Sequence, residues 1–153
     1  MREAVSFKIG VSASYWNKVP RYLISICDAA GACIATTDEL EATETTTYTT
    51  IEFDKEPGNY ELRIELLNKS PKDTVVSMGN IVNDMLLNVD SIEYDGIELE
   101  HLVSTASIYR LKSPQVYNNQ TITELAKCVN LGWNGYYSLP FTSPVHEWLL
   151  ENL

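Results

Sequence analysis

The sequence has 153 residues, the usual size of one domain, and 44% of them are hydrophobic while 21% are charged. This composition excludes a fully disordered chain and a collagen-like repeat. Eleven Lys and Arg against twenty-one Asp and Glu give a formal net charge of −10, which disfavours nucleic acid and anionic membrane surfaces as partners. We therefore expect a single domain over residues 1–153, with no nucleic-acid partner and no membrane partner.

Apolar and polar residues alternate along three early segments, which is the pattern of strands with one buried face. The apolar positions are Val5, Phe7, Ile9 and Val11, then Tyr22, Ile24 and Ile26, and then Tyr60, Leu62, Ile64 and Leu66. Residues 43–53 are mostly β-branched or aromatic and favour another strand. A turn sequence follows at residues 56–59, where Pro57 and Gly58 lie side by side.

Asp95 and Gly96 separate two apolar stretches, which is a strong signal for a tight hairpin. Residues 104–111 and 136–141 predict two more strands. The chain then has about eight or nine short strands with turn signals between them, a pattern typical of a sandwich or jelly roll.

A helix is predicted over about residues 144–152. Ser143 is suited to capping it, Pro144 suits the first helical position, and Val145, Trp148 and Leu149 share one face. The predicted fold class is therefore all-β, a jelly-roll-like antiparallel β-sandwich with this short C-terminal helix packed on it.

Three cysteines, Cys27, Cys33 and Cys128, occur without a CxxC pair, which disfavours a thiolate metal site. Cys27 and Cys33 flank residues 28–32 and can face each other across a hairpin, although spacing alone leaves the bridge open. No secretory signal is visible at the N-terminus, and disulfides are rare in the cytoplasm, so free thiols are the favoured alternative.

The two histidines, His101 and His146, lie in no recognisable catalytic motif. His146 and Glu147 begin like a zinc-protease helix, but Leu150 stands where the second histidine would be. No nucleophile elbow or phosphate-binding glycine loop is present either. The sequence therefore predicts a protein that is not an enzyme.

Segments 66–74, 83–92 and 94–97 form a strand that ends in Asn, a polar loop with Asp, an Asn-Asp pair, and a strand that closes with Asp-Gly. This order resembles the non-catalytic, often calcium-binding carbohydrate-binding modules that are built as β-sandwiches. The resemblance implies a Ca²⁺ site made by the side-chain oxygens of Asn68, Asp73, Asn83 and Asp84. The alternative is that these residues form hydrogen-bonded turns, and Lys69 and Lys72 in the same loop would place positive charge beside any cation.

Two aromatic clusters occur in loop-like sequence and are candidates for ligand binding. They comprise Tyr15 and Trp16 near the start of the chain, and Trp133, Tyr136 and Tyr137 near its end. Sugar rings stack on such side chains, but aromatic residues also anchor protein interfaces or pack into cores. All three interpretations remain open at this point.

A second resemblance lies in segments 131–144 and 148–153, whose layout is similar to small proteins encoded by tailed bacteriophages. It implies a non-catalytic structural or adhesion component of a phage particle, in the capsid, neck, tail or fibre. Its location would be the virion, and its partners would be other virion proteins or further copies of itself. The alternative function is a carbohydrate-binding module that recognises a neutral polysaccharide, with calcium as an optional rather than a required ligand.

Overall fold

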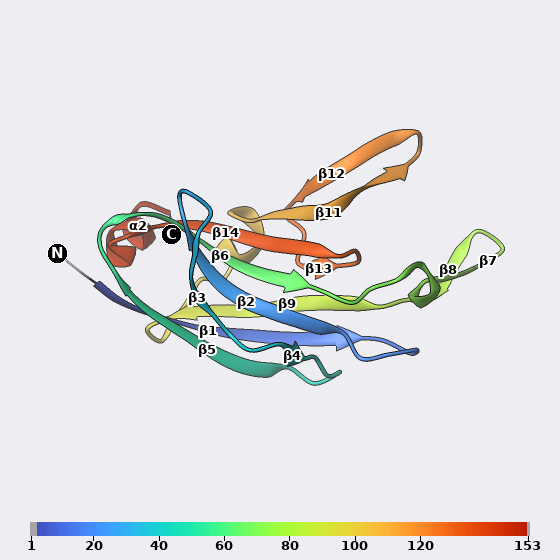
Figure 1. Cartoon of the computed structure of the whole chain (residues 1–153), viewed down its shortest axis with the longest axis horizontal. Coiled ribbons are helices and arrows are strands. Elements are labelled where there is room, and N and C mark those ends of the chain that lie inside the picture. Colours follow the sequence, from blue (N-terminus) through green and yellow to red (C-terminus); the bar gives the residue numbers. More distant parts are fainter. Residues whose placement is uncertain (1–2, 153) are drawn as a thin grey trace.

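The computed structural model describes residues 3–152, which fold into two stacked antiparallel sheets (Figure 1). Sheet A has the order β10-β9-β1-β5, with β13 also paired to β9. Sheet B has the order β12-β11-β14-β6-β2-β3, with β4 also paired to β2. This architecture confirms the predicted all-β sandwich.

Sheet A consists of β1 (Glu3–Ser14), β5 (Thr47–Lys55), β9 (Leu86–Tyr94), β10 (Ile97–Glu98) and β13 (Asn130–Leu131). Sheet B consists of β2 (Arg21–Asp28), β3 (Cys33–Thr36), β4 (Leu40–Glu41), β6 (Gly58–Leu66), β11 (Ile108–Tyr117), β12 (Gln120–Ala126) and β14 (Gly135–Ser143). The alternation seen in the sequence accounts for the core between the sheets, because the apolar residues of β1, β2 and β6 are buried in it.

The predicted turn at residues 56–59 connects the two sheets. β5 pairs with β1 in sheet A, whereas β6 begins at Gly58 and pairs with β14 and β2 in sheet B. Aromatic rings fill the core at this end, where the Phe53 and Tyr60 ring centroids lie 5.4 Å apart and Phe141 stacks on Tyr60. The turn therefore helps to close the sandwich.

The predicted hairpin at Asp95 and Gly96 is confirmed, since β9 and β10 pair on either side of it. Both turn residues have positive φ, 48° at Asp95 and 82° at Gly96, which is the backbone that a two-residue turn of the primed type requires.

The predicted C-terminal helix is also confirmed as α2 (Val145–Asn152), which buries Val145, Trp148 and Leu149 against the sandwich. Two short helical turns were not predicted: η1 (Pro71–Asp73) and α1 (Leu102–Thr105). α1 occupies the start of the predicted strand 104–111, so that strand, β11, begins only at Ile108. The buried side chains of Leu102 and Val103 explain this turn, because they anchor it in the core.

The expectation of free thiols at Cys27 and Cys33 is wrong, since the two form a disulfide. In the hairpin of β2 and β3 they are register partners, so their side chains meet across the strands. Cys128 is a half-buried free cysteine.

Two hairpins extend from one end of the body (Figure 1). β7 (Val75–Ser77) and β8 (Asn80–Asn83) form the first, and β11 with β12 forms the second. They expose the apolar side chains of Val76, Met78, Ile81, Val82, Val116 and Tyr117. Within residues 3–152, no helix has both the length and the hydrophobicity needed to cross a membrane.

Candidate functional site

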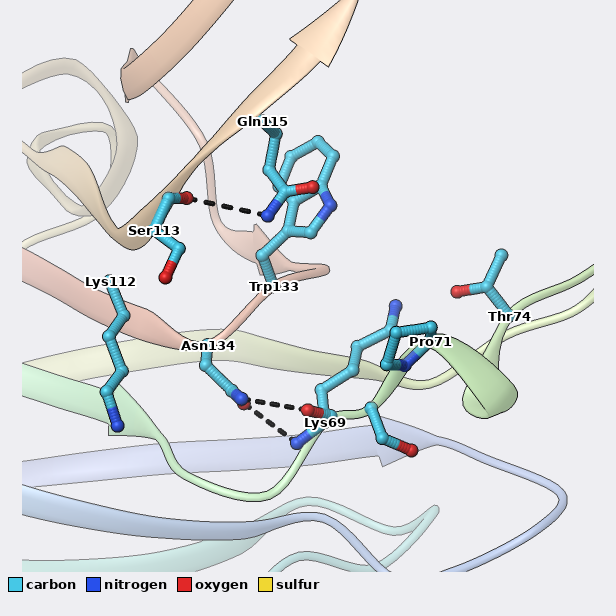
Figure 2. Close-up of a pocket in the computed structure, with 9 residues that line it drawn as sticks. Lys69, Pro71, Thr74, Lys112, Ser113, Gln115, Trp133 and Asn134 are labelled. Atoms are coloured by element: carbon cyan, nitrogen blue, oxygen red, sulfur yellow. Dashed lines mark hydrogen bonds between the residues drawn. The ribbon is translucent and has the colours of Figure 1, made fainter.

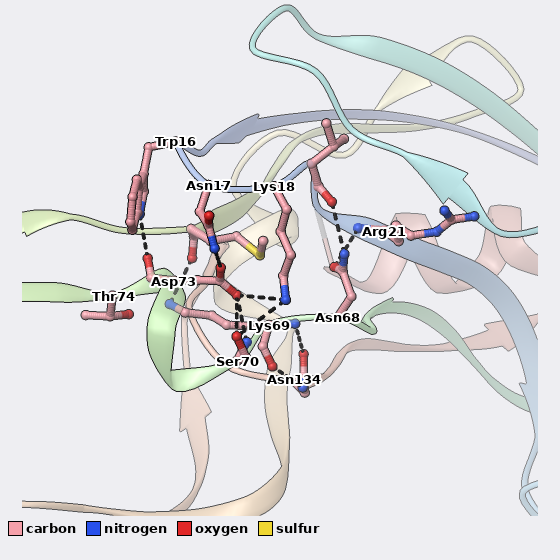
Figure 3. Close-up of polar contacts among 12 residues, drawn as sticks. Trp16, Asn17, Lys18, Arg21, Asn68, Lys69, Ser70, Asp73, Thr74 and Asn134 are labelled. Atoms are coloured by element: carbon pink, nitrogen blue, oxygen red, sulfur yellow. Dashed lines mark hydrogen bonds and ion pairs between the residues drawn. The ribbon is translucent and has the colours of Figure 1, made fainter.

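Loop 68–74, which runs from the end of β6 to the start of β7, is held by two side-chain amides (Figure 3). Asn68 donates from Nδ2 to Val19 O at 3.0 Å and accepts at Oδ1 from Arg21 N at 2.8 Å. Asn134 donates to Lys69 O and accepts from Lys69 N, both at 2.8 Å. Each side-chain amide thus donates to one backbone carbonyl and accepts from one backbone N–H, as a neighbouring strand would. The loop is therefore hydrogen-bonded to the chain on both of its sides.

The first side of the loop carries the Asp73 cluster, which we define as Asp73 with Asn17, Lys18 and Ser70. The Asp73 carboxylate is fully buried. It accepts hydrogen bonds from Asn17 Nδ2 at 2.9 Å, Ser70 N at 2.8 Å and Ser70 Oγ at 3.0 Å, and Lys18 Nζ lies 3.1 Å away. Burial raises the pKa of this carboxyl, but the bonds from Asn17, Ser70 and Lys18 outweigh it and lower the pKa to about 2. The carboxylate is therefore ionised and enclosed.

Asp84, which lies between β8 and β9, is held in a similar way by loop 68–74 and by its neighbour Met85. Its Oδ1 accepts from Lys69 Nζ and Thr74 Oγ1, both at 2.6 Å, and from Met85 N at 2.9 Å. Burial raises the pKa of Asp84, but these hydrogen bonds and the Lys69 charge hold it below its ordinary value. The Lys69 ammonium also donates to Met85 O at 2.9 Å, so its charge is already paired within the protein.

The predicted calcium ligands do not form a cation site in this arrangement. Asn68 uses both ends of its amide on backbone groups, Asp73 and Asp84 each face a lysine ammonium, and Asn83 is exposed in β8. Among residues 3–152, no group of three or more His, Cys, Asp or Glu side chains is placed to hold a metal ion. Since Ca²⁺ needs six to eight oxygen ligands turned toward it, these residues do not fit the ion.

The second side of the loop borders a pocket of about 530 Å³ (Figure 2). It is lined by Lys69, Ser70, Pro71, Thr74, Lys112, Ser113, Gln115, Trp133 and Asn134. These residues come from loop 68–74, from the middle of β11 and from the segment that precedes β14. The half-buried Trp133 indole is the aromatic surface of this pocket, and the other groups are mainly hydrogen-bonding side chains.

A buried tyrosine, Tyr109, holds the Trp133 backbone by hydrogen bonds. The Tyr109 hydroxyl donates to Trp133 O and accepts from Trp133 N at 3.0 Å. Burial raises the pKa of Tyr109 far above its ordinary value, so the hydroxyl keeps its proton. Gly135 has φ of 152°, and a Cβ there would overlap Arg110 O and approach Leu111 Cα to 2.9 Å. The segment around Trp133 therefore depends on close packing against β11.

Two of the predicted ligand-binding aromatics lie beside loop 68–74, on its two sides. Trp133 lines the pocket, and Trp16 donates from Nε1 to Asp73 O at 2.9 Å while 47% of it is exposed. Tyr15 is half-buried and packs against the core.

The other two predicted aromatics, Tyr136 and Tyr137, lie in β14 instead of a loop. Tyr136 is half-buried beneath the Arg63 guanidinium, 4.5 Å from its ring centroid. Tyr137 is fully buried, and its hydroxyl donates to Val103 O. Of the three interpretations left open for the aromatic clusters, core packing describes Tyr137, because the alternation along β14 turns this side chain into the core.

Sequence reasoning missed the pocket residues Lys112 and Gln115 and the supporting Tyr109. Lys112 donates from its backbone N to Asn134 O at 2.9 Å, which joins β11 to the segment before β14 where both residues line the pocket. No local pattern marks these residues, because the pocket exists only where β11 packs against β14 and the loop. A better sequence signal existed for Asn134, since this residue directly follows Trp133.

No protein-family model and no curated protein matches the sequence. Two solved structures of carbohydrate-binding modules resemble the fold. vCBM60 in complex with galactobiose has a TM-score of 0.54 and 17% identity, over 88% of this chain and 96% of that one. The selenomethionine form of vCBM60, described as part of a circular-permutation link between two families of calcium-dependent carbohydrate-binding modules, has a TM-score of 0.52 and 16% identity, over 88% and 89%. At this identity the likeness establishes a shared sandwich fold.

Proposed function

We propose that this protein is a non-catalytic glycan-binding module and that its site is the pocket beside Trp133. The observation that carries the proposal is a half-buried indole in a pocket of about 530 Å³, surrounded by amide, hydroxyl and ammonium groups. A sugar ring has an apolar C–H face and a polar rim, so it needs this combination of an aromatic surface and nearby hydrogen-bonding groups.

The rigidity of the site supports binding. Tyr109 holds the Trp133 backbone, and the Asn134 side chain is hydrogen-bonded to the Lys69 backbone. A pocket whose walls are fixed before the ligand arrives loses less conformational entropy on binding than a flexible one. The same sandwich fold in vCBM60, which is seen in complex with galactobiose, is further support by analogy.

The composition of the pocket supports binding without turnover. Its described lining residues include no His, Asp or Glu, the side chains that most often serve as the general base that a Ser or Thr nucleophile needs. We therefore assign the pocket a recognition role. A role in a phage particle, a virion location and self-association stay predictions from the sequence, since none of the comparisons bears on them.

The test is calorimetric titration of the protein with a panel of oligosaccharides that includes galactobiose. We expect binding to at least one of them, and we expect Trp133→Ala to weaken it about tenfold or more, which corresponds to about 1.4 kcal/mol. The matched control is Tyr48→Ala, because Tyr48 is 60% exposed but lies in β5 of the opposite sheet. Absence of binding across the panel, or full affinity in a folded Trp133→Ala variant, would contradict the proposal.

A further inference from the structure

The charge of the pocket is opposite to that of the whole protein. The chain has a formal net charge of −10, yet the described lining residues include Lys69 and Lys112 and no carboxylate. Resting on the proposed function, we propose that the preferred ligand is an acidic oligosaccharide, with one ring on Trp133 and a carboxylate or sulfate group on the Lys112 ammonium.

Lys112 is the cation available to a ligand. The Lys69 side chain is only 9% exposed, and its ammonium lies 2.6 Å from Asp84 Oδ1. Lys112 is exposed, and none of the described carboxylates forms an ion pair with it. Figure 2 shows its side chain extending past Asn134 and away from the Trp133 indole, while its backbone N donates to Asn134 O. Lys112 therefore contributes a charge without an ion-pair partner among the described residues to the lining of the pocket.

The hydrogen-bonding groups of the pocket also favour an anion. A sugar hydroxyl both donates and accepts hydrogen bonds, whereas a carboxylate or sulfate group only accepts them, so free donors in the pocket favour the anion. The side-chain acceptor of Asn134 already receives Lys69 N, and the Ser70 and Thr74 hydroxyls donate to Asp73 and Asp84.

Two donors that line the pocket are free or weakly engaged. They are the Lys112 ammonium and the Gln115 amide, which makes a long 3.4 Å bond to Ser113 O. An anionic oxygen accepts from such groups in shorter and stronger hydrogen bonds than a neutral one does.

The experiment compares pairs of oligosaccharides that differ only in an acidic group. Galactobiose is titrated beside digalacturonate, which has the same rings with carboxylates at C6, and beside a sulfated galactobiose. Mannobiose and dimannuronate form a second pair. The proteins are the unaltered chain, Lys112→Gln, and the control Lys8→Gln, which removes a lysine from β1 in the other sheet. Thermal midpoints check that all three are folded.

We expect the acidic member of at least one pair to bind about fivefold or more tightly than its neutral partner. Lys112→Gln should weaken the acidic sugar more than the neutral one and so remove this preference, whereas Lys8→Gln should keep the preference. The uronate and sulfate arms show which anionic group the site takes. Equal or tighter binding of neutral sugars that depends on Trp133 would overturn this inference and leave the proposed function standing. Absence of binding to every sugar would overturn both.

Discussion

The two sides of loop 68–74 differ in how completely their polar groups are paired. On the first side, the Asp73 carboxylate is buried and receives hydrogen bonds from Asn17 and Ser70 and the Lys18 charge. On the second side, the pocket contains the exposed Lys112 ammonium, which has no ion-pair partner among the described residues, and the half-buried Trp133 indole. The contrast teaches that acidic residues in a polar loop can serve its rigidity, while the recognition groups lie on the opposite wall.

The largest expected effect comes from a substitution in the Asp73 cluster, on the first side of loop 68–74. Asp73→Ala should lower the free energy of unfolding by about 3 kcal/mol, because it leaves the Asn17 and Ser70 donors without their acceptor and removes the partner of the half-buried Lys18. Urea denaturation measures the loss. Asp38→Ala is the control, since Asp38 is exposed and should cost no more than about 0.5 kcal/mol. Equal stability in both variants would show that the Asp73 cluster is not a structural support.

Gly135→Ala should disturb the pocket, on the second side of loop 68–74. A Cβ would overlap Arg110 O, and the φ of 152° disfavours any residue with a side chain. We expect a loss of about 2–3 kcal/mol in unfolding free energy, together with loss of glycan binding. Gly132→Ala is the matched control, since its Cβ would meet the movable Leu86 side chain at 3.3 Å. Similar losses in both variants would argue against the special backbone requirement at Gly135.

Acid should also destabilise the protein through the Asp73 cluster. Because the Asp73 pKa is lowered from 3.8 to about 2 in the folded protein, its stabilising contribution is present above pH 4 and is lost as the pH falls through 2. The shift corresponds to roughly 2 kcal/mol, and Asp84, whose pKa is also lowered, acts in the same direction. Urea unfolding at pH 5 and pH 2 measures the difference. Asp73→Asn should have a smaller pH dependence, and an unchanged one would place the acid sensitivity elsewhere.

Two buried tyrosines separate stability from recognition. Tyr109→Phe and Tyr137→Phe each remove one hydroxyl that donates to a backbone carbonyl, Trp133 O and Val103 O respectively. Each should cost about 1 kcal/mol in unfolding free energy. Only Tyr109→Phe should also weaken glycan binding, by roughly threefold, as titration calorimetry would show, because it alone loosens the Trp133 backbone. Equal affinity in both variants would mean that the pocket does not depend on Tyr109.

The smallest expected effect is that of calcium. Asp73 and Asp84 already face lysine ammonium groups, so we expect the thermal midpoint in millimolar calcium to match that in EDTA within about 1 °C. A site filled at 100 times its dissociation constant would add about 2.7 kcal/mol and raise the midpoint by several degrees. Such a rise would show that the lysines give way to a metal ion.

The sequence by itself determined β1, β2, β5, β6, β9 and β14, the Asp95–Gly96 hairpin and α2. Each depends on contacts or backbone preferences within a few residues: the alternation along β1, β2 and β6, the positive φ at the turn, and the apolar face of one short helix. It also drew attention to Trp16, Asp73 and Trp133, which the fold does place around one loop.

Only the tertiary structure decided what these residues do. Asn17 and Asp73 are 56 positions apart, and Lys69 and Asn134 are 65 apart, so no local pattern could pair them. The same holds for Lys69 and Asp84, which are 15 positions apart, and for Lys112, which meets the other pocket residues only in the fold. The carboxylates looked like cation ligands because residue type reveals how a group can bond, whereas its actual partner depends on which strands the fold brings together.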